Sequence, residues 1–249
     1  MEKSKMLGIL GGLGPMSTVY FYELITALTP ASCDQEHIDI VISSRATTPD
    51  RTEYILGRSD KNPLDCMIPD AKRLVAFGAQ IIAIPCNTAH YFYDRLAAEV
   101  DVPILNIIEE SVKTLKQSGV SRFGLLATEG TVKSGTYQKY CAGRKVECVI
   151  PDEIHQKRVN DIIYGQIKQN RPVSPESFYE VVHYMRSLGC ERVILGCTEL
   201  SLLKKELRLG EFYTDSLECL AVSTIRACGK TPVKQIQIPT SADIKPVLT

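Results

Sequence analysis

The sequence predicts an α/β protein with parallel sheets flanked by helices, and three observations lead to this fold class. Short apolar runs alternate with stretches of helical spacing almost throughout the chain, as they do in βαβ units. Several of these runs lack polar alternation, which is typical of strands that are buried on both faces of a parallel sheet. A length of 249 residues, 44% of them hydrophobic, is enough for an ordered chain of one to two domains.

The first half of the chain is expected to begin with a strand, a glycine loop and a helix. The loop Gly11-Gly12-Leu13-Gly14 separates an apolar run from residues with helical spacing. A later helix stops at a glycine, and the strand that follows it leads into Pro85-Cys86-Asn87-Thr88. In chain order we expect a strand at 6–10, a helix from 16, a strand at 38–42, a helix at 66–77 and a strand at 80–84.

The second half repeats this order of elements. Its penultimate strand leads into Gly196-Cys197-Thr198-Glu199, much as the strand at 80–84 leads into Cys86. In chain order we expect a strand at 122–126, a helix at 134–140, a strand at 146–150, a helix at 178–188, a strand at 192–195, and a last strand and helix within 212–227.

Three pairs of segments indicate an internal repeat. Gly8-Ile9-Leu10 matches Gly124-Leu125-Leu126, the segment around Cys86 matches that around Cys197, and 102–106 matches 211–215, with nearly the same spacing in each pair. We therefore predict two similar lobes related by a pseudo-twofold axis, with the active site in the cleft between them. The first lobe is expected to comprise 1–102 and the returning segment 212–230, the second 103–211, and a C-terminal tail or arm 231–249.

Charge and composition exclude several classes of partner. The 29 basic and 29 acidic residues balance, so nucleic-acid binding is not expected. No apolar run approaches the ~20 residues of a membrane span, and the chain starts by running into a strand rather than a signal peptide. Nine cysteines are an odd number, which excludes a fully paired secreted framework. We therefore expect a cytoplasmic protein with reduced thiols and no membrane contact.

Cys86 and Cys197 are the candidate catalytic residues. Each follows the carboxyl end of a predicted parallel strand, where ligands bind in such sheets. A helix is expected to open directly after each cysteine, and its N-terminus would lower the thiol pKa. A thiolate and a thiol on opposite faces of a carbon acid can exchange its proton with inversion and without a cofactor. No metal site is expected, because Cys86 and His90 have too few accompanying ligands.

Four ordered blocks resemble the cofactor-independent aspartate/glutamate racemases, and more closely their aspartate racemase branch. The resemblance covers nearly the whole chain except the tail. It implies that Cys86 and Cys197 are the paired acid and base that interconvert L- and D-aspartate, with glutamate as a further substrate, in a homodimer without pyridoxal phosphate, metal or nucleotide. The blocks are Gly8-Ile9-Leu10-Gly11-Gly12-Leu13-Gly14-Pro15, Pro85-Cys86-Asn87-Thr88-Ala89-His90, Gly124-Leu125-Leu126-Ala127-Thr128-Glu129-Gly130-Thr131 and Gly196-Cys197-Thr198-Glu199-Leu200.

The resemblance also implies which residues contact a small dicarboxylic amino acid. Asn87, Thr88 and Thr198, with the backbone amide of Ala89, resemble the family's groups for the α-carboxylate. The cations that would receive the side-chain carboxylate are Arg51 and Lys168.

Glu199 has three possible roles: to orient the Cys197 thiol, to bind the substrate ammonium, or only to be a first-turn acid of a helix. The glutamate racemase branch has a DSG-type loop after its first strand and GCTH after its second cysteine. This chain has Gly11-Gly12-Leu13-Gly14 and Gly196-Cys197-Thr198-Glu199 instead, which favours aspartate.

Three alternatives stay open. The glycine loop could bind a nucleotide, but its spacing is GGxG rather than GxGxxG, and no acidic residue ends the second strand. Another member of the superfamily could isomerise an unsaturated diacid between its cis and trans forms, with a cysteine attacking the double bond. A catalytically silent relative would bind an acidic amino acid without turnover.

Overall fold

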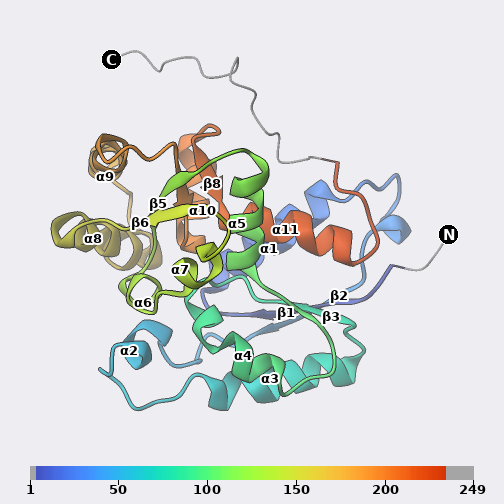
Figure 1. Ribbon diagram of the computed structural model, residues 1–249. Helices are drawn as coiled ribbons and strands as arrows, with labels where there is room; N and C mark the ends of the chain where they lie inside the picture. Colours follow the sequence, from blue (N-terminus) through green and yellow to red (C-terminus); the bar gives the residue numbers. More distant parts are fainter. Residues whose placement is uncertain (1–3, 234–249) are drawn as a thin grey trace.

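Two parallel four-stranded sheets form the framework of the computed structural model, which describes residues 4–233 (Figure 1). The strand order is β2-β1-β3-β4 in the first sheet and β6-β5-β7-β8 in the second, so each strand has a counterpart. This arrangement confirms the predicted fold class. The strands are β1 (Leu7–Gly11), β2 (Ile40–Ser44), β3 (Ile81–Ala83), β4 (Ile104–Leu105), β5 (Arg122–Leu126), β6 (Glu147–Val149), β7 (Arg192–Leu195) and β8 (Tyr213–Asp215).

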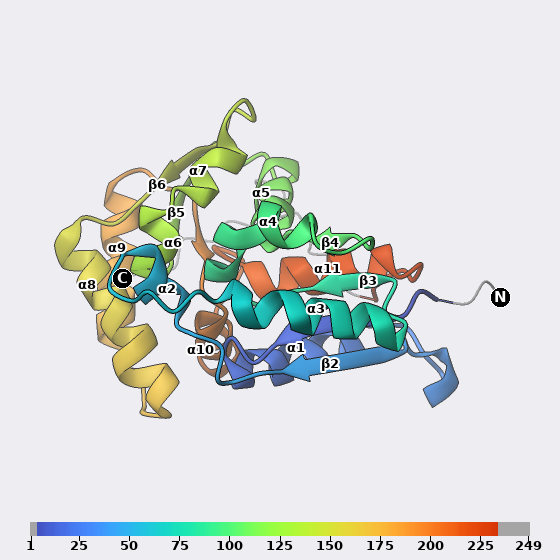
Figure 2. The same cartoon turned by 90° about the horizontal axis from the view of Figure 1, so that it is seen from below.

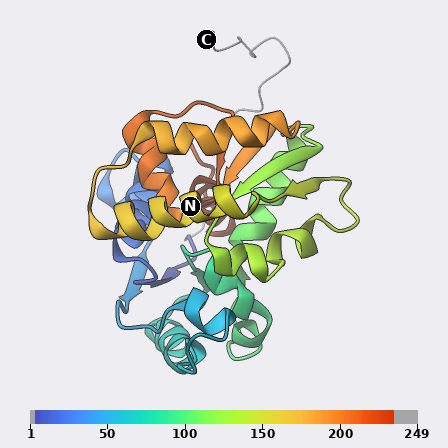
Figure 3. The same cartoon turned by 90° about the vertical axis from the view of Figure 1, so that its left-hand side faces the viewer.

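Helices cover both sheets. Helix α3 packs along the first sheet (Figure 2), and α8 and α9 lie side by side in the second half (Figure 3). None of the helices within residues 4–233 is long and apolar enough to cross a membrane. The α-helices are α1 (Pro15–Leu28), α2 (Arg51–Ile55), α3 (Leu64–Phe77), α4 (Tyr93–Ala97), α5 (Ile107–Gln117), α6 (Glu129–Lys133), α7 (Thr136–Cys141), α8 (Glu153–Asn160), α9 (Pro175–Ser187), α10 (Thr198–Leu207) and α11 (Ser216–Ala227).

Four short helical segments complete the described chain. Three are 3-10 turns and one is a π-helix that continues α8. They are η1 (Asp34–Glu36), η2 (Thr88–Phe92), the π-helix η3 (Asp161–Gln166) and η4 (Ile167–Gln169).

One apolar core joins the two sheets through α5 and α11. Helix α5 follows the first sheet and packs against α7 of the second half, whereas α11 follows the second sheet and packs against α1 of the first. The two helices also pack against each other. Phe21 of α1, Ile108 of α5, Phe123 of β5 and Leu217 of α11 all belong to one buried cluster. The relative placement of the sheets therefore depends on these two exchanged helices.

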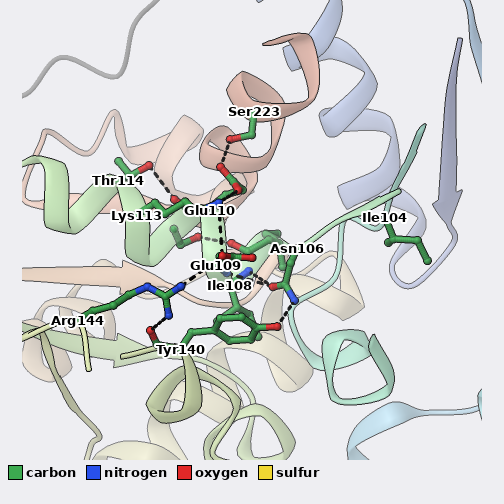
Figure 4. Close-up of polar contacts among 12 residues, drawn as sticks. Ile104, Asn106, Ile108, Glu109, Glu110, Lys113, Thr114, Tyr140, Arg144 and Ser223 are labelled. Carbon is green, nitrogen blue, oxygen red and sulfur yellow. Dashed lines mark hydrogen bonds and ion pairs between the residues drawn. The ribbon is translucent and has the colours of Figure 1, made fainter. Parts of the chain in front are cut away.

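Polar contacts fasten the start of α5 to its neighbours (Figure 4). Asn106 caps the helix by accepting the backbone N–H of Ile108 at 3.0 Å, and its side-chain amide donates to the Tyr140 hydroxyl of α7 at 2.8 Å. Ser223 of α11 donates to the Glu110 carboxylate at 2.6 Å. The carboxyl end of β4 is thereby held against both α7 and α11.

Two strands lie in the opposite lobe to the one predicted. β4 falls within the predicted second lobe 103–211, but it pairs with β3 and completes the first sheet. β8 was expected to return to the first lobe with 212–230, but it pairs with β7. The prediction was wrong at these strands because the chain crosses between the two halves only after β4 and after β8. The crossing elements are the helices that follow these strands, α5 and α11. Of the predicted tail, residues 234–249 lie outside the described residues.

A buried carboxylate fixes the loop after β2. Asp70 of α3 accepts two hydrogen bonds from the Arg45 guanidinium, at 2.6 and 2.7 Å, and one from Arg73 at 2.6 Å. The hydrogen bonds from Arg45, with the added contribution of Arg73, lower the pKa of Asp70 although the side chain is buried. Arg45 begins the loop that leads to Arg51, so this ion pair positions that loop.

We expect Asp70→Asn to lower the free energy of unfolding by about 2 kcal/mol at pH 7, because Arg45 loses its charged bidentate partner. The folded-state pKa of Asp70 lies below its unfolded value of about 4, so the stabilisation is present above that value and is lost as the pH falls through the folded pKa. Urea unfolding over a pH series measures this, with Asp60→Asn at an exposed position as control. A difference that persists unchanged into strong acid would contradict the assignment.

Candidate active site

Polar residues from both halves of the molecule meet in one small cavity at the carboxyl ends of the strands. It contains every predicted site residue except Ala89, which is buried on η2. No group of three His, Cys, Asp or Glu side chains in the described part of the chain could hold a metal ion. The cavity is lined by Leu13, Asp50, Arg51, Thr52, Cys86, Asn87, Thr88, Thr128, Tyr164, Lys168, Cys197, Thr198 and Glu199.

The two cysteines enter this cavity from equivalent positions. Cys86 follows β3 and Cys197 follows β7, and these strands occupy the same place in the two sheet orders. Both side chains are buried, and all nine cysteines of the chain are free thiols. The duplicated topology therefore delivers one thiol to the cavity from each half.

The thiol of Cys197 belongs to a buried chain of polar groups. It donates to Glu199 Oε2 at 2.9 Å, and the other carboxylate oxygen of Glu199 accepts from Lys168 Nζ at 2.6 Å. Burial raises the pKa of Cys197 well above its ordinary value; Glu199 raises it further, while Lys168 acts in the opposite direction. Burial alone would lower the pKa of Lys168, but Glu199 raises it overall. The protonated thiol of Cys197 and the ammonium of Lys168 are thus the forms that these surroundings stabilise.

The expected lowering of the Cys197 pKa by a helix N-terminus is therefore corrected. Cys197 does cap the N-terminus of α10, but burial and the adjacent Glu199 outweigh the helix dipole and keep it protonated. After Cys86 the chain forms only the 3-10 turn η2, with Asn87 at its start, instead of an α-helix. The sequence could not reveal either point, because both depend on which side chains the fold brings alongside.

Asn87 and Thr88 connect the Cys86 loop to the second half. The Asn87 amide donates to Ser216 Oγ at 2.9 Å, and its oxygen accepts the Tyr137 hydroxyl at 2.8 Å. The Thr88 hydroxyl lies 2.9 Å from that of Thr128. These side chains are thus already engaged by protein groups, which fixes their orientation beside Cys86.

Further contacts across the cavity hold the two halves together. Thr198 Oγ1 donates to the Pro85 carbonyl at 3.2 Å, and the Tyr164 hydroxyl donates to Thr52 Oγ1 at 2.8 Å. The remaining free volume is about 10 Å³, which is room for about one water molecule. A substrate therefore fits only if these side chains move apart.

The Arg51 guanidinium retains unused donors. Nη1 donates to the carbonyls of Thr48 (3.3 Å) and Pro49 (3.0 Å), and Nη2 donates to the Leu13 carbonyl at 2.6 Å. Nε is buried and has no partner among the described residues. A buried N–H without an acceptor is costly, so this edge of Arg51 is suited to receive a carboxylate.

Two residues near the predicted ones had no functional role assigned from the sequence. Tyr164 lies four residues before Lys168, within the same helical stretch, and that spacing could have indicated a shared face. His90 donates from Nδ1 to the Cys86 carbonyl at 2.8 Å, and its Nε2 accepts the Ile107 backbone N–H at 3.3 Å. The i,i+4 spacing of Cys86 and His90 thus reflects a histidine that supports the Cys86 loop.

A two-lobed fold with a thiol from each half at one polar cavity is that of a cofactor-independent racemase. The model of the Asp/Glu/hydantoin racemase family matches residues 10–224, and the chain belongs to this family. It is 30% identical to the broad specificity amino-acid racemase RacX of Bacillus subtilis over 224 residues, which are 88% of this chain and 96% of RacX.

Solved structures of similar proteins agree with the fold. The Picrophilus torridus aspartate racemase superposes with a TM-score of 0.78 at 29% identity, covering 94% of this chain and 98% of that one. An aspartate racemase homologue from Pyrococcus horikoshii has a TM-score of 0.73 at 27% identity, covering 92% of this chain and all of the other (100%).

We expect Glu199→Gln to lower the pKa of Cys197, because the substitution removes a neighbouring negative charge while the thiol stays buried. Iodoacetamide modification of Cys197, followed by mass spectrometry over a pH series, should then begin at lower pH than in the wild type. Glu206→Gln, at an exposed position on the same helix, is the matched control. An unchanged or higher onset in Glu199→Gln would contradict the role given to this carboxylate.

Proposed function

We propose that the protein interconverts L- and D-aspartate, with Cys86 and Cys197 as acid and base on opposite faces of Cα. The observation that carries this proposal is the convergence of the two thiols on one cavity that also contains Arg51 and Lys168. Family membership supports racemisation as the reaction, and the named relatives include aspartate racemases and a broad specificity racemase. Glutamate is the second substrate in this proposal.

The reaction is a proton exchange at one carbon. One cysteine, as thiolate, takes the Cα proton; the electrons of the C–H bond move into the α-carboxylate, and the other cysteine delivers its proton to the opposite face. In this proposal Asn87, Thr88 and Thr198, which line the cavity, bind that carboxylate together with the Ala89 amide of the same loop as Cys86. Donors held in place beforehand stabilise the developing charge without having to reorganise. The two cysteines finish with their protonation states exchanged.

Glu199 gives the two thiols different environments. Its hydrogen bond from Cys197 supports the orienting role among those expected for it, and Lys168 balances its charge. Cys197 in its resting form is then the proton donor, and Cys86 is the partner that takes the Cα proton. For the reverse direction, Cys197 must first release its proton.

Arg51 receives the side-chain carboxylate in this proposal. Its buried Nε–H has no protein acceptor among the described residues, and Arg51 is one of the residues that line the cavity. The small free volume favours the shorter aspartate over glutamate, and either substrate can enter only when contacts such as Tyr164–Thr52 separate. We also propose a cytoplasmic homodimer; its nine free thiols suit a reducing compartment.

Incubation in deuterated water tests the proposal directly. The purified protein is given L-Asp, D-Asp, L-Glu or D-Glu under reducing conditions and without added cofactor. We expect deuterium at Cα together with inversion, fastest for aspartate. Binding without exchange would favour a silent binding protein, and turnover only of an unsaturated diacid would favour the cis/trans isomerase; either outcome would overturn racemisation.

We expect Cys86→Ala and Cys197→Ala each to reduce racemisation at least ~10³-fold, because inversion requires a group on both faces. Any residual deuterium exchange should affect one enantiomer, and the opposite one in the other variant. Chiral chromatography with mass detection measures both quantities. Cys141→Ala, at a buried thiol away from the cavity, should keep full activity. Racemisation at the wild-type rate by either active-site variant would rule out the two-thiol mechanism.

We expect Arg51→Lys to raise KM for aspartate about 10-fold or more, because a lysine ammonium cannot bind a carboxylate in bidentate fashion. The inhibition constant of succinate, which has two carboxylates and no amine, should rise in parallel. Steady-state kinetics measure both values, with the exposed Arg58→Lys as control. A change in kcat alone, with KM and succinate inhibition unaltered, would remove Arg51 from substrate binding.

A further inference from the structure

The glycine loop after β1 packs tightly against the Glu199 carboxylate. Gly14 precedes α1 with φ −111° and ψ 152°, an extended conformation that any residue can adopt. A Cβ added to Gly14 would lie 2.6 Å from Glu199 Oε1 and 3.8 Å from Lys168 Nζ. The first distance is too short for a carbon and an oxygen that are not bonded. Glycine is therefore needed at this position for the close approach of the backbone, and not for its conformation.

Thr18 of α1 holds this loop in place. Its hydroxyl donates to the Gly14 carbonyl at 3.0 Å and accepts the Gly12 backbone N–H at 2.9 Å. The carbonyl before Gly14, that of Leu13, accepts from Arg51 Nη2 at 2.6 Å. Thr18 is buried, so little water competes for its hydrogen bonds. The backbone at Gly14 is therefore fixed on both sides.

The Glu199 carboxylate occupies the space that Gly14 leaves. Glu199 belongs to α10 of the second half, and 8% of its side chain is exposed. Both carboxylate oxygens are already in use, because Oε1 accepts from Lys168 at 2.6 Å and Oε2 accepts from the Cys197 thiol at 2.9 Å. A displacement of Oε1 therefore disturbs the hydrogen bond from Lys168, the one from Cys197, or both.

We propose that Gly14 is a positioning residue for racemisation: its bare backbone keeps the Glu199 carboxylate between the Lys168 ammonium and the Cys197 thiol. Gly14 does not itself line the cysteine cavity, so it acts on Cys197 only through Glu199. This inference deepens the proposed function and rests on it for its effect on turnover. The contact between Gly14 and Glu199 does not depend on which substrate is converted.

Titration of the Cys197 thiol tests the contact without turnover. Protein labelled with ¹³C at the cysteine Cβ is followed by NMR over a pH series. The Cys197 resonance, identified by its loss in Cys197→Ala, shifts when the thiol ionises. We expect this change to begin about one pH unit or more lower in Gly14→Ala than in the wild type, because the displaced carboxylate no longer accepts the thiol proton. An unchanged or higher onset would overturn the proposal.

The matched control is Gly210→Ala. Gly210 is exposed, and an added Cβ would have no atom within 4 Å. This variant should reproduce the wild-type titration of Cys197. A shift as large as that in Gly14→Ala would show that the effect is not specific to Gly14.

A double variant shows whether Gly14 acts through Glu199. In Glu199→Ala the carboxylate that would collide with the added methyl is absent, so Gly14→Ala should have no further effect on the Cys197 titration in that background. A further shift of similar size would mean that Gly14 acts by another route, and the proposal would fail. Should Gly14→Ala not fold, Thr18→Val, which loses both loop hydrogen bonds, should also lower the onset, whereas Thr18→Ser should not. Identical titrations of these two variants would then contradict the proposal.

Steady-state kinetics separate this inference from the proposed function. We expect Gly14→Ala to lower kcat for aspartate at least 10-fold with a smaller change in KM, because the Cys197 thiol loses its fixed orientation. A fall in kcat with an unchanged Cys197 titration would indicate a general distortion and would overturn the positioning role. If the wild type does not racemise aspartate, the proposed function fails, while the titrations still decide whether Gly14 positions Glu199.

Discussion

The apolar contact between α5, α11 and the two sheets is the constraint on which the candidate site depends. Each helix is covalently attached to one half and packed against the other, so the core belongs to both halves at once. This packing fixes how the carboxyl edge of one sheet faces that of the other. Without it, Cys86 and Cys197 would each lie at the end of a buried strand, but they would share no cavity.

Electrostatics then distinguish two thiols that topology makes equivalent. Cys197 has an acidic neighbour in hydrogen-bonding distance, and the carboxylate is balanced by Lys168 from the stretch that follows α8. Burial strengthens each of these interactions because little water is present to screen them. The duplication therefore supplies two similar positions, and Glu199 and Lys168 give Cys197 charged neighbours that raise and lower its pKa, respectively.

Much of the fold was predictable from local pattern, because buried parallel strands are continuous apolar runs. The strands at 122–126 and 192–195 have the same bounds in the structure, whereas the short helices α2 and α8 were missed because polar residues dominate them. The exchange of strands between the predicted lobes was not visible, since a break at Pro103 looks like a boundary although β4 still pairs with β3.

At the site, motifs predicted which residues gather. They left open whether Glu199 orients the Cys197 thiol, and they could not predict that Arg51 would keep a free Nε–H, because the acceptors of Arg51 include the Leu13 carbonyl, which is distant in sequence.

The narrow cavity has a consequence for how successive turnovers of the proposed reaction are linked. With room for about one water, the site limits the exchange between bulk solvent and the proton that a cysteine has just taken from Cα. After the product leaves, the cysteine that was a thiolate before the reaction is protonated, and the other cysteine has become the thiolate. The free protein therefore exists in two isomeric forms, each prepared for only one enantiomer. These forms interconvert through opening and exchange with solvent. The rate of that interconversion determines whether the rate of one turnover depends on which enantiomer was converted in the turnover before it.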